Sequence, residues 1–439
     1  MQTMKKTFAV AALVGVFAST GCGILDVNNP NNLTEESLSK TQAAAAVVNG
    51  ALALAAVAVS DIWQVYGVAT DELVWTGSRD AWQALDYGFL SNAENEFTDV
   101  AYPELAQARW MADEAVRLVK VHVDEGLTEF NGTLAKAYLT AGTLYTVIGE
   151  VQQEMTFSNK REAGAPVPAA QMPSVFDDAV SRLDQAVSLA RAAGDGEVET
   201  RALAMRARAK FAKGIRAKIQ PSVNTASPLV QDAGAAADAN AALALMGGTD
   251  WHWDFEYSAS TVTNQLASWI NSRAENRVGP AYVVPDPLDI KKFIGISLED
   301  PIDGGPDREI DRRVNGFFVA GLVYQPLLIV DERQMHMIVA ENALAGGNSA
   351  AFADAINAVR VDLDGVTAFS GQISDRAMLE HERKVNTFLT GQRLADMYRF
   401  GIVDADWQPN GDARSAPGTL LPITITEIRS NCHMNGVGC

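Results

Sequence analysis

The feature that most constrains the fold is a spacing that recurs in four segments, where small and apolar residues follow one another at alternating steps of three and four. This spacing marks one face of an α-helix, because a helical turn takes 3.6 residues. Many of these positions are alanine, which lets two helix backbones approach closely. We therefore expect a mostly α fold of packed amphipathic helices. The four sets are Leu105, Ala108, Ala112, Ala115 and Val119; Leu134, Tyr138, Ala141, Tyr145 and Ile148; Phe176, Val180, Leu183, Val187 and Ala190; and Ala204, Ala207, Phe211 and Ile215.

The succession of these helices resembles tetratricopeptide-like helical hairpins, with an insertion at residues 153–173. A plain helical bundle would pack by the same rules and is the alternative. An earlier helix is predicted to open at residues 34–37 and to continue to about residue 59. Runs of Gly, Pro and Asp then interrupt the pattern, and helices resume at Asp331, whose side chain is expected to cap the helix while Gln334 reaches back. Further helices are predicted over residues 352–361 and 375–399.

These patterns divide the chain into three parts after its leader. Residues 35–246 form an N-terminal, tetratricopeptide-like helical part, residues 247–325 a loop-rich insertion, and residues 326–439 a C-terminal helical part. Loops carry binding residues more often than the elements that they connect. Ligand binding is therefore expected in the insertion.

The N-terminus has the layout of an export signal. A short basic stretch at residues 4–6 precedes an uncharged apolar stretch at residues 7–19, which is too short to span a bilayer. Small residues then lead to Cys22, in a pattern that resembles a lipobox with Ser19 in place of the usual leucine. We predict a signal peptide over residues 1–21, lipid on Cys22, and a lipidated tether of turn-forming residues over 22–34.

The net charge and the remaining cysteines agree with an exported, globular protein. The formal charge of −19 repels phosphate backbones, so nucleic acid is not expected as a partner. Besides Cys22 the chain has only Cys432 and Cys439, which are close enough in sequence to close a small loop in an oxidising compartment. We predict a disulfide between them; two free thiols at a frayed end are the alternative.

The C-terminal part carries a series of motifs in order. Residues 334–343 (QMHMIVAENA) and 357–360 (NAVR) come first, followed by Glu382, Arg383 and Lys384, then residues 390–401 (TGQRLADMYRFG) and 421–431 (LPITITEIRSN). Together with residues 25–31 (LDVNNPN) and the pair Asp71 and Glu72, this pattern resembles the SusD/RagB family of nutrient-binding outer-membrane lipoproteins. Thr390 and Thr424 depart from the family pattern, and the chain is short for the family.

The resemblance implies a SusD-like fold and a binding role without chemistry of its own. It implies a lipid-anchored location at the cell outer membrane, facing the cell exterior. It also implies a SusC-like TonB-dependent outer-membrane transporter as partner. The charged residues of the motifs lie at helical spacings that allow ion pairs, so we interpret them as ties between the last helices and not as ligand contacts. They are Glu382, Arg383, Arg393, Asp396 and Arg399.

No arrangement of residues predicts catalysis, a metal site or a cofactor. The five histidines have no metal-ligand spacing, and nucleotide-binding glycine motifs and a GxSxG motif are missing from the sequence. Abundant carboxylates leave a glycosidase pair open. Asp300, Asp303 and Asp307 alternate with Pro and Gly, which favours turns over a calcium loop.

Two aromatic clusters are candidates for ligand binding, because a sugar ring rests its CH face on an indole while polar side chains bind its hydroxyls. In each case packing of the aromatic rings is the alternative. Trp269, with Asn271 and Arg273, is a weaker candidate. The first cluster comprises Trp75, Arg79, Asp80 and Trp82 on a loop with Gly77 and Ser78, and the second comprises Trp251, Trp253 and Tyr257 on an extended segment.

The sequence therefore predicts a protein that binds an oligosaccharide and delivers it to a transporter. Capture of peptides or another nutrient by the same fold is the nearest alternative. A helical-repeat envelope scaffold without a small-molecule ligand is a further alternative, and a glycan hydrolase is a third.

Overall fold

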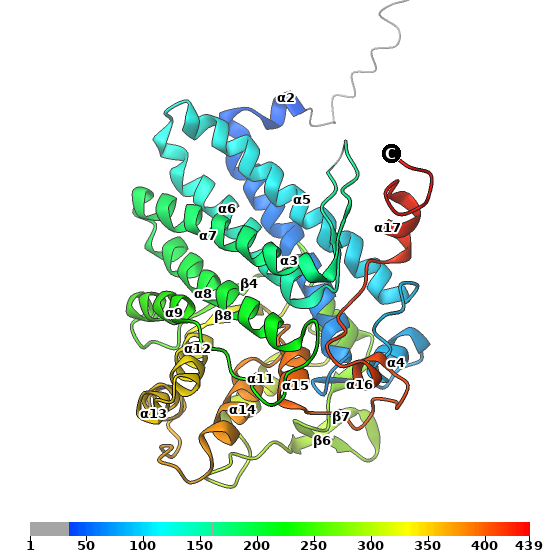
Figure 1. Ribbon diagram of the computed structural model, residues 1–439, viewed down its shortest axis with the longest axis vertical. Coiled ribbons are helices and arrows are strands. Elements are labelled where there is room, and N and C mark those ends of the chain that lie inside the picture. The colour runs from blue at the N-terminus through cyan, green and yellow to red at the C-terminus, as the bar shows by residue number, and fades with distance from the viewer. Residues whose placement is uncertain (1–34, 160) are drawn as a thin grey trace, which may run out of the picture. The chain divides into compact units, whose positions relative to one another are not determined.

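The structure is a computed structural model that describes residues 35–159 and 161–439 (Figure 1). The predicted signal peptide, Cys22 and the tether at residues 22–34 lie outside the described residues. The chain divides into two units, residues 1–43 and 44–439. Of the first unit, the structure describes two short helices, α2 (Glu35–Leu38) and η1 (Thr41–Ala43). The single helix predicted to open at residues 34–37 and to end near residue 59 is therefore wrong, because α2 is followed by η1 and by the separate long helix α3 (Ala44–Val68).

Helices packed side by side form the N-terminal half of the second unit (Figure 1). α3 packs on α5 (Glu96–Asp124) and α6 (Asn131–Val151), and α6 packs on α7 (Pro173–Ala193). α8 (Gly196–Ile219) follows α7 after two residues and packs on both α7 and α9 (Ala233–Met246). The four helices predicted from their spacing, α5 to α8, are confirmed.

The close approach of α6 and α7 depends on two glycines. A Cβ atom at Gly142 would lie 2.5 Å from Cγ of Leu183, and one at Gly149 would lie 2.6 Å from the Phe176 ring. Both distances are too short for a van der Waals contact between carbon atoms of different residues. Small residues at this contact therefore allow Leu183 and Phe176 to lie against the α6 backbone.

α3 is unusually apolar for a helix of a globular protein. Together with residues 41–43, it has the length and composition needed to cross a membrane, but half of its most apolar window is buried inside the protein. From Ala55 onward it packs within the core, and Asp61 and Gln64 are buried with it. Its hydrophobicity thus follows from its central position in the helical layer.

The predicted loop-rich insertion contains short strands that pair with strands outside it. β4 (His252–Phe255) pairs antiparallel with β8 (Leu327–Asp331), and β5 (Asn276–Val278) pairs with β1 (Leu73–Trp75). β6 (Val283–Asp286) and β7 (Asp289–Ile296) form a hairpin. The remaining elements of this region are α10 (Gln265–Ala267), η4 (Ser268–Ser272) and α11 (Arg308–Phe317), while β2 (Met155–Thr156), β3 (Pro166–Val167) and η3 (Ala169–Gln171) lie in the insertion between α6 and α7.

The C-terminal part adds helices that pack on α8 and α9. Asp331 caps α12 (Glu332–Ala345) as predicted, since its Oδ1 accepts a hydrogen bond from the backbone N–H of Gln334 at 2.8 Å. The single helix predicted over residues 375–399 is wrong, because the chain turns at Leu389 and Gly391, both with positive φ. The other elements are α13 (Ser349–Asn357), η5 (Ala358–Leu363), α14 (Asp375–Asn386), α15 (Arg393–Phe400), α16 (Asp412–Ser415) and α17 (Ile425–Ser430).

Buried ion pairs join these last helices. Arg383 Nε donates to Asp396 Oδ2 at 2.8 Å, and Arg399 binds both Asp396 (2.7 Å) and the Glu341 carboxylate. Arg393 forms a two-pronged pair with Asp71, both distances being 2.7 Å. All of these side chains are buried, so each guanidinium depends on its carboxylate. The predicted structural role of the motif residues is confirmed, and Asp71 ties α15 to the end of α3.

Candidate ligand-binding site

Strand pairing between β1 and β5 places two half-buried tryptophans, Trp75 and Trp269, on adjoining segments of the backbone. Trp75 lies opposite Asn276, and the backbone of Glu275 accepts from Thr76 N at 2.9 Å while donating to Trp269 O at 3.1 Å. The exposed side chains of Arg79 and Arg273 lie over the Trp269 ring, with Cζ 5.8 and 4.3 Å from its centroid. We call Trp75, Arg79, Trp269 and Arg273 the tryptophan patch.

Glu275 holds the loop that carries Arg79. Its Oε2 accepts hydrogen bonds from the backbone N–H groups of Ser78 (2.8 Å) and Arg79 (3.1 Å), and its Oε1 accepts from Ser78 Oγ (3.1 Å). Burial raises the pKa of Glu275, but these hydrogen bonds outweigh it and hold the pKa below its usual value. A Cβ at Gly77 would lie 2.7 Å from Cα of Glu275, so this turn requires glycine. The loop is therefore preorganised by a residue nearly 200 positions away.

Trp82 lies beneath the patch and does not reach solvent. Its ring stacks on Phe97 with centroids 3.7 Å apart, and Trp269 packs edge-on against it at 5.6 Å. The prediction that the loop presents Trp82 to a ligand is wrong about its exposure, because this stacking places the ring in the core. Trp82 instead supports Trp269 from below.

The two predicted polar residues of the first cluster are exposed. Asp80 is the first residue of α4 (Asp80–Asp86), where a carboxylate favours the helix N-terminus. The Arg79 guanidinium binds Glu96 at 2.8 Å, and both side chains are about half exposed. Such an exposed pair is weak, so Arg79 can exchange Glu96 for another partner.

The face of Trp269 can be uncovered from the solvent side. Arg273 covers it, and its side chain is exposed. An exposed cation–π contact contributes only about 0.5–1 kcal/mol. A flat ligand face of comparable area can therefore replace Arg273, while the guanidinium remains near enough to donate hydrogen bonds to ligand hydroxyls. The patch has the components of a surface that binds hydroxylated rings.

The second predicted cluster is mostly buried. Trp253 and Phe255 are the buried residues of β4, Tyr257 is buried two residues beyond the strand, and its hydroxyl donates to Ala56 O at 2.7 Å. The prediction is thus wrong about the exposure of Trp253 and Tyr257, because α3 covers them. Trp251 precedes the strand and is half-buried. Trp253 keeps one edge on a pocket of about 400 Å³ that is shared with Leu52 and Arg201.

Two features of the structure were not predicted from the sequence. Glu275 orders the first loop, and a separate pocket lies between β4 and α11, with Arg312, Phe317, Gln325 and Phe388 among its lining residues. These residues come from distant segments, so no local pattern marks them.

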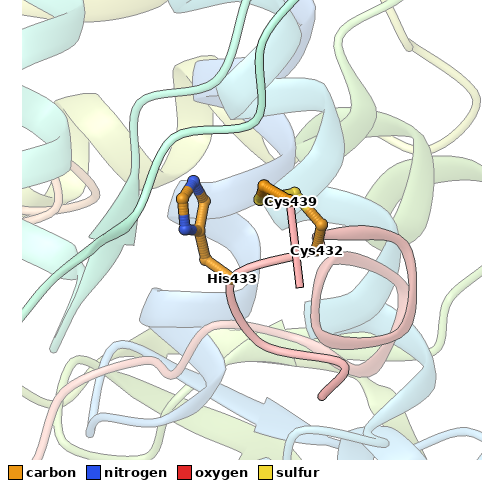
Figure 2. A group of neighbouring side chains, drawn as sticks. All are labelled: Cys432, His433 and Cys439. Carbon is orange, nitrogen blue, oxygen red and sulfur yellow. A yellow bond between two sulfur atoms is a disulfide. The ribbon is translucent and has the colours of Figure 1, made fainter. Parts of the chain in front are cut away.

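The predicted disulfide between Cys432 and Cys439 is present (Figure 2). His433 lies beside it, but both sulfur atoms are bonded to each other, and His433 Nε2 is 3.0 Å from the carbonyl oxygen of Ala163. These three residues therefore offer no thiolate to a metal ion.

Asp300, Asp307 and His381 form the other cluster with potential metal ligands. Both carboxylate oxygens of Asp300 bind the guanidinium of Arg360, at 2.9 and 3.1 Å, which disfavours a cation there. Asp300 also accepts from the backbone N–H groups of Ile302 and Asp303, and Asp307 caps α11. The turn-forming role predicted for these aspartates is confirmed for Asp300.

Comparison with known proteins identifies the fold. No protein-family model and no curated protein matches the chain. Among solved structures, a putative sugar binding protein from Bacteroides vulgatus superimposes with a TM-score of 0.60 at 14% identity, covering 90% of this chain and 97% of that one.

Two further structures are similar. A SusD superfamily protein from Parabacteroides distasonis gives a TM-score of 0.60 at 10% identity over 92% of this chain and 98% of its own. A SusD-like carbohydrate binding protein from Bacteroides vulgatus gives 0.54 at 10% identity, over 82% and 83%. The superpositions cover 82–92% of this chain, which has the SusD-like fold.

Proposed function

We propose that this protein binds an oligosaccharide at the tryptophan patch and delivers it to a TonB-dependent transporter. The main observation in support of this site is that two half-buried indoles, Trp75 and Trp269, occur with the exposed guanidinium groups of Arg79 and Arg273. Indole faces accept the CH face of a sugar ring, and guanidinium groups donate to its hydroxyls. Proteins of the same fold that are described as carbohydrate-binding or sugar-binding support this choice of ligand.

The hydrogen bonds that hold the loop of the tryptophan patch favour a binding role over catalysis. Glu275 accepts three hydrogen bonds from Ser78 and Arg79, so it is occupied as an anchor of the loop. A rigid loop reduces the entropy that is lost when a ligand binds. We therefore assign the protein a capture role and no reaction.

The location and the partner rest on the sequence motifs. Lipid on Cys22 would hold the protein at the outer membrane, with its binding surface facing the cell exterior. A SusC-like barrel is the proposed transporter, because the motif series resembles that of proteins that work with such barrels. The tether would raise the effective concentration of the binding protein beside its transporter.

Calorimetric titration of the mature protein against a panel of oligosaccharides and peptides tests the ligand and the site together. We expect at least one oligosaccharide to bind, and we expect Trp269→Ala and Trp75→Ala each to weaken that binding at least tenfold. Trp251→Ala is the matched control, because it removes a half-buried indole outside the patch. If only peptides bind, the proposal that the ligand is an oligosaccharide is contradicted. If both patch variants bind with undiminished affinity, the proposal that the tryptophan patch is the binding site is contradicted.

A further inference from the structure

A second cavity, distinct from the tryptophan patch, lies between β4 and α11. It encloses about 260 Å³, and we call it the β4–α11 pocket. Its walls come from β4, α11, β8, the segment before β8, and the turn between α14 and α15. None of the residues that form the tryptophan patch lines it. The pocket is of a size for one small ring and not for a chain of rings.

The charged residues of this pocket already have partners. Arg313 binds Asp331 at 2.8 Å, and Arg312 binds Glu309 at 2.7 Å. Asp250 pairs with Arg333 at 2.9 Å, and Asp254 lies 3.5 Å from His252. A ligand cation would meet the two arginines, and a ligand anion would meet three aspartates. The balance of charges therefore favours a neutral ligand.

One wall of the pocket is apolar and aromatic. Phe317 of α11 and Phe388 of the α14–α15 turn contribute rings, and Leu327 and Leu389 contribute aliphatic groups. Such residues accept CH groups, whereas His252, Asp254 and Arg312, which also line the pocket, offer hydrogen-bonding groups. A ligand that fits must combine an apolar face with polar edges.

Gln325 adds a specific requirement. Its side chain lines the pocket, and neither the amide nitrogen nor the amide oxygen has a hydrogen-bond partner among the described residues. Both atoms are buried, and an unmatched buried amide is unfavourable. A ligand that presents a donor and an acceptor side by side, as two neighbouring hydroxyls do, would match both atoms once the side chain turns toward the cavity.

We propose that the β4–α11 pocket is a second binding site, which takes one neutral cyclic polyol of monosaccharide size. The ring's CH face lies on Phe317 and Phe388, and two neighbouring hydroxyls bind the Gln325 amide. This inference goes beyond oligosaccharide capture at the tryptophan patch and does not depend on it, because the residues that carry it are different.

Ligand-observed NMR with the mature protein tests this site, using free hexoses, N-acetylhexosamines and myo-inositol as probes. We expect saturation transfer to at least one probe and a loss of at least tenfold in its affinity in Gln325→Leu, which keeps the size of the side chain but removes the amide. Trp269→Ala should bind the probe as the wild type does.

A second variant fills the β4–α11 pocket without disturbing the fold, so that a loss of binding cannot be attributed to misfolding. Gly316 lines the pocket, and a Cβ placed on it meets no atom within 4 Å, so Gly316→Leu adds bulk to the pocket without strain in α11. Gly50→Leu is the matched control, since Gly50 is also a helical glycine with open space around it, and it does not line this pocket. We expect Gly316→Leu to abolish binding of the probe and Gly50→Leu to leave it unchanged.

The outcomes separate the two sites. Loss of monosaccharide binding in Gly316→Leu and Gln325→Leu, with binding kept in Trp269→Ala, supports the second site even if no oligosaccharide binds the tryptophan patch. Binding that persists in both pocket variants, or that Trp269→Ala removes, overturns it. No saturation transfer to any probe in the wild type also overturns it.

Discussion

Glu72, a single residue of the motif series, lies inside the fold and affects its stability. Its side chain is fully buried, Oε1 accepts from Leu389 N at 2.8 Å, and Oε2 has no partner among the described residues. Burial raises the pKa of Glu72 to about 8. In the unfolded chain the pKa is about 4.3. Folding therefore favours the protonated form, and stability falls as the pH rises from about 4 to about 8.

We predict that Glu72→Gln reduces this dependence. The amide keeps the acceptor for Leu389 N but cannot ionise, so the variant should lose less stability than the wild type between pH 5 and pH 8. Urea denaturation at several pH values measures the difference in free energy of unfolding. Parallel pH profiles for the two proteins would show that Glu72 is ionised in the folded state.

The exposure of individual tryptophans could not be predicted from the sequence. Trp75 and Trp82 are seven residues apart in one cluster, yet Trp75 is half-buried and Trp82 is completely buried. The difference arises because Phe97, at the start of the following long helix, stacks on Trp82. Local pattern carries no information about a contact of this kind. By contrast, the cap at Asp331 and the disulfide depend on neighbours in sequence and were predicted correctly.

Among the helices and strands, those with a regular spacing of apolar residues could be predicted from the sequence. α5 to α8 follow from the spacing of their apolar residues, since each presents one face to its neighbours. The break between α14 and α15 was missed, although Gly391 lies within it. A Cβ on that glycine would lie 2.4 Å from Trp63 Nε1, a contact that involves a helix more than 300 residues away. The pairing of β4 with β8 was missed for the same reason.

The contact between α6 and α7 gives a paired prediction. Gly149→Ala places a Cβ against the Phe176 ring, and we expect overpacking to cost about 1–3 kcal/mol in the free energy of unfolding. Gly50→Ala in α3 meets no atom within 4 Å and should stabilise the protein by about 0.5–1 kcal/mol through helix propensity. Chemical denaturation measures both. A stabilising Gly149→Ala would contradict the tight packing of α6 on α7.

For the whole molecule, the fold could be predicted where the ligand could not. The C-terminal motifs recur in the structure as buried ion pairs, such as Arg393 with Asp71, which join distant parts of the chain. The fold itself is shared with solved structures that are 14% identical or less. The tryptophan patch has no such marker, because its order depends on Glu275 and on strand pairing.

The proposed anchor is also a property of the whole molecule. We predict that Cys22→Ala moves the protein from the membrane fraction to the soluble fraction, because about 0.8 kcal/mol per buried methylene is lost with the lipid. Replacement of Cys432 and Cys439 by serine is the control and should leave the protein on the membrane. Membrane retention of Cys22→Ala in cells without the transporter would contradict lipid anchoring.

In the proposed complex, an oligosaccharide binds across Trp75 and Trp269. A crystal structure of the mature protein with the tightest-binding oligosaccharide of the panel would show where the sugar lies. We predict a sugar ring on the Trp269 face in the place of the Arg273 guanidinium, with Arg79 or Arg273 donating to its hydroxyls. An oligosaccharide bound elsewhere, with Arg273 still stacked on Trp269, would contradict it.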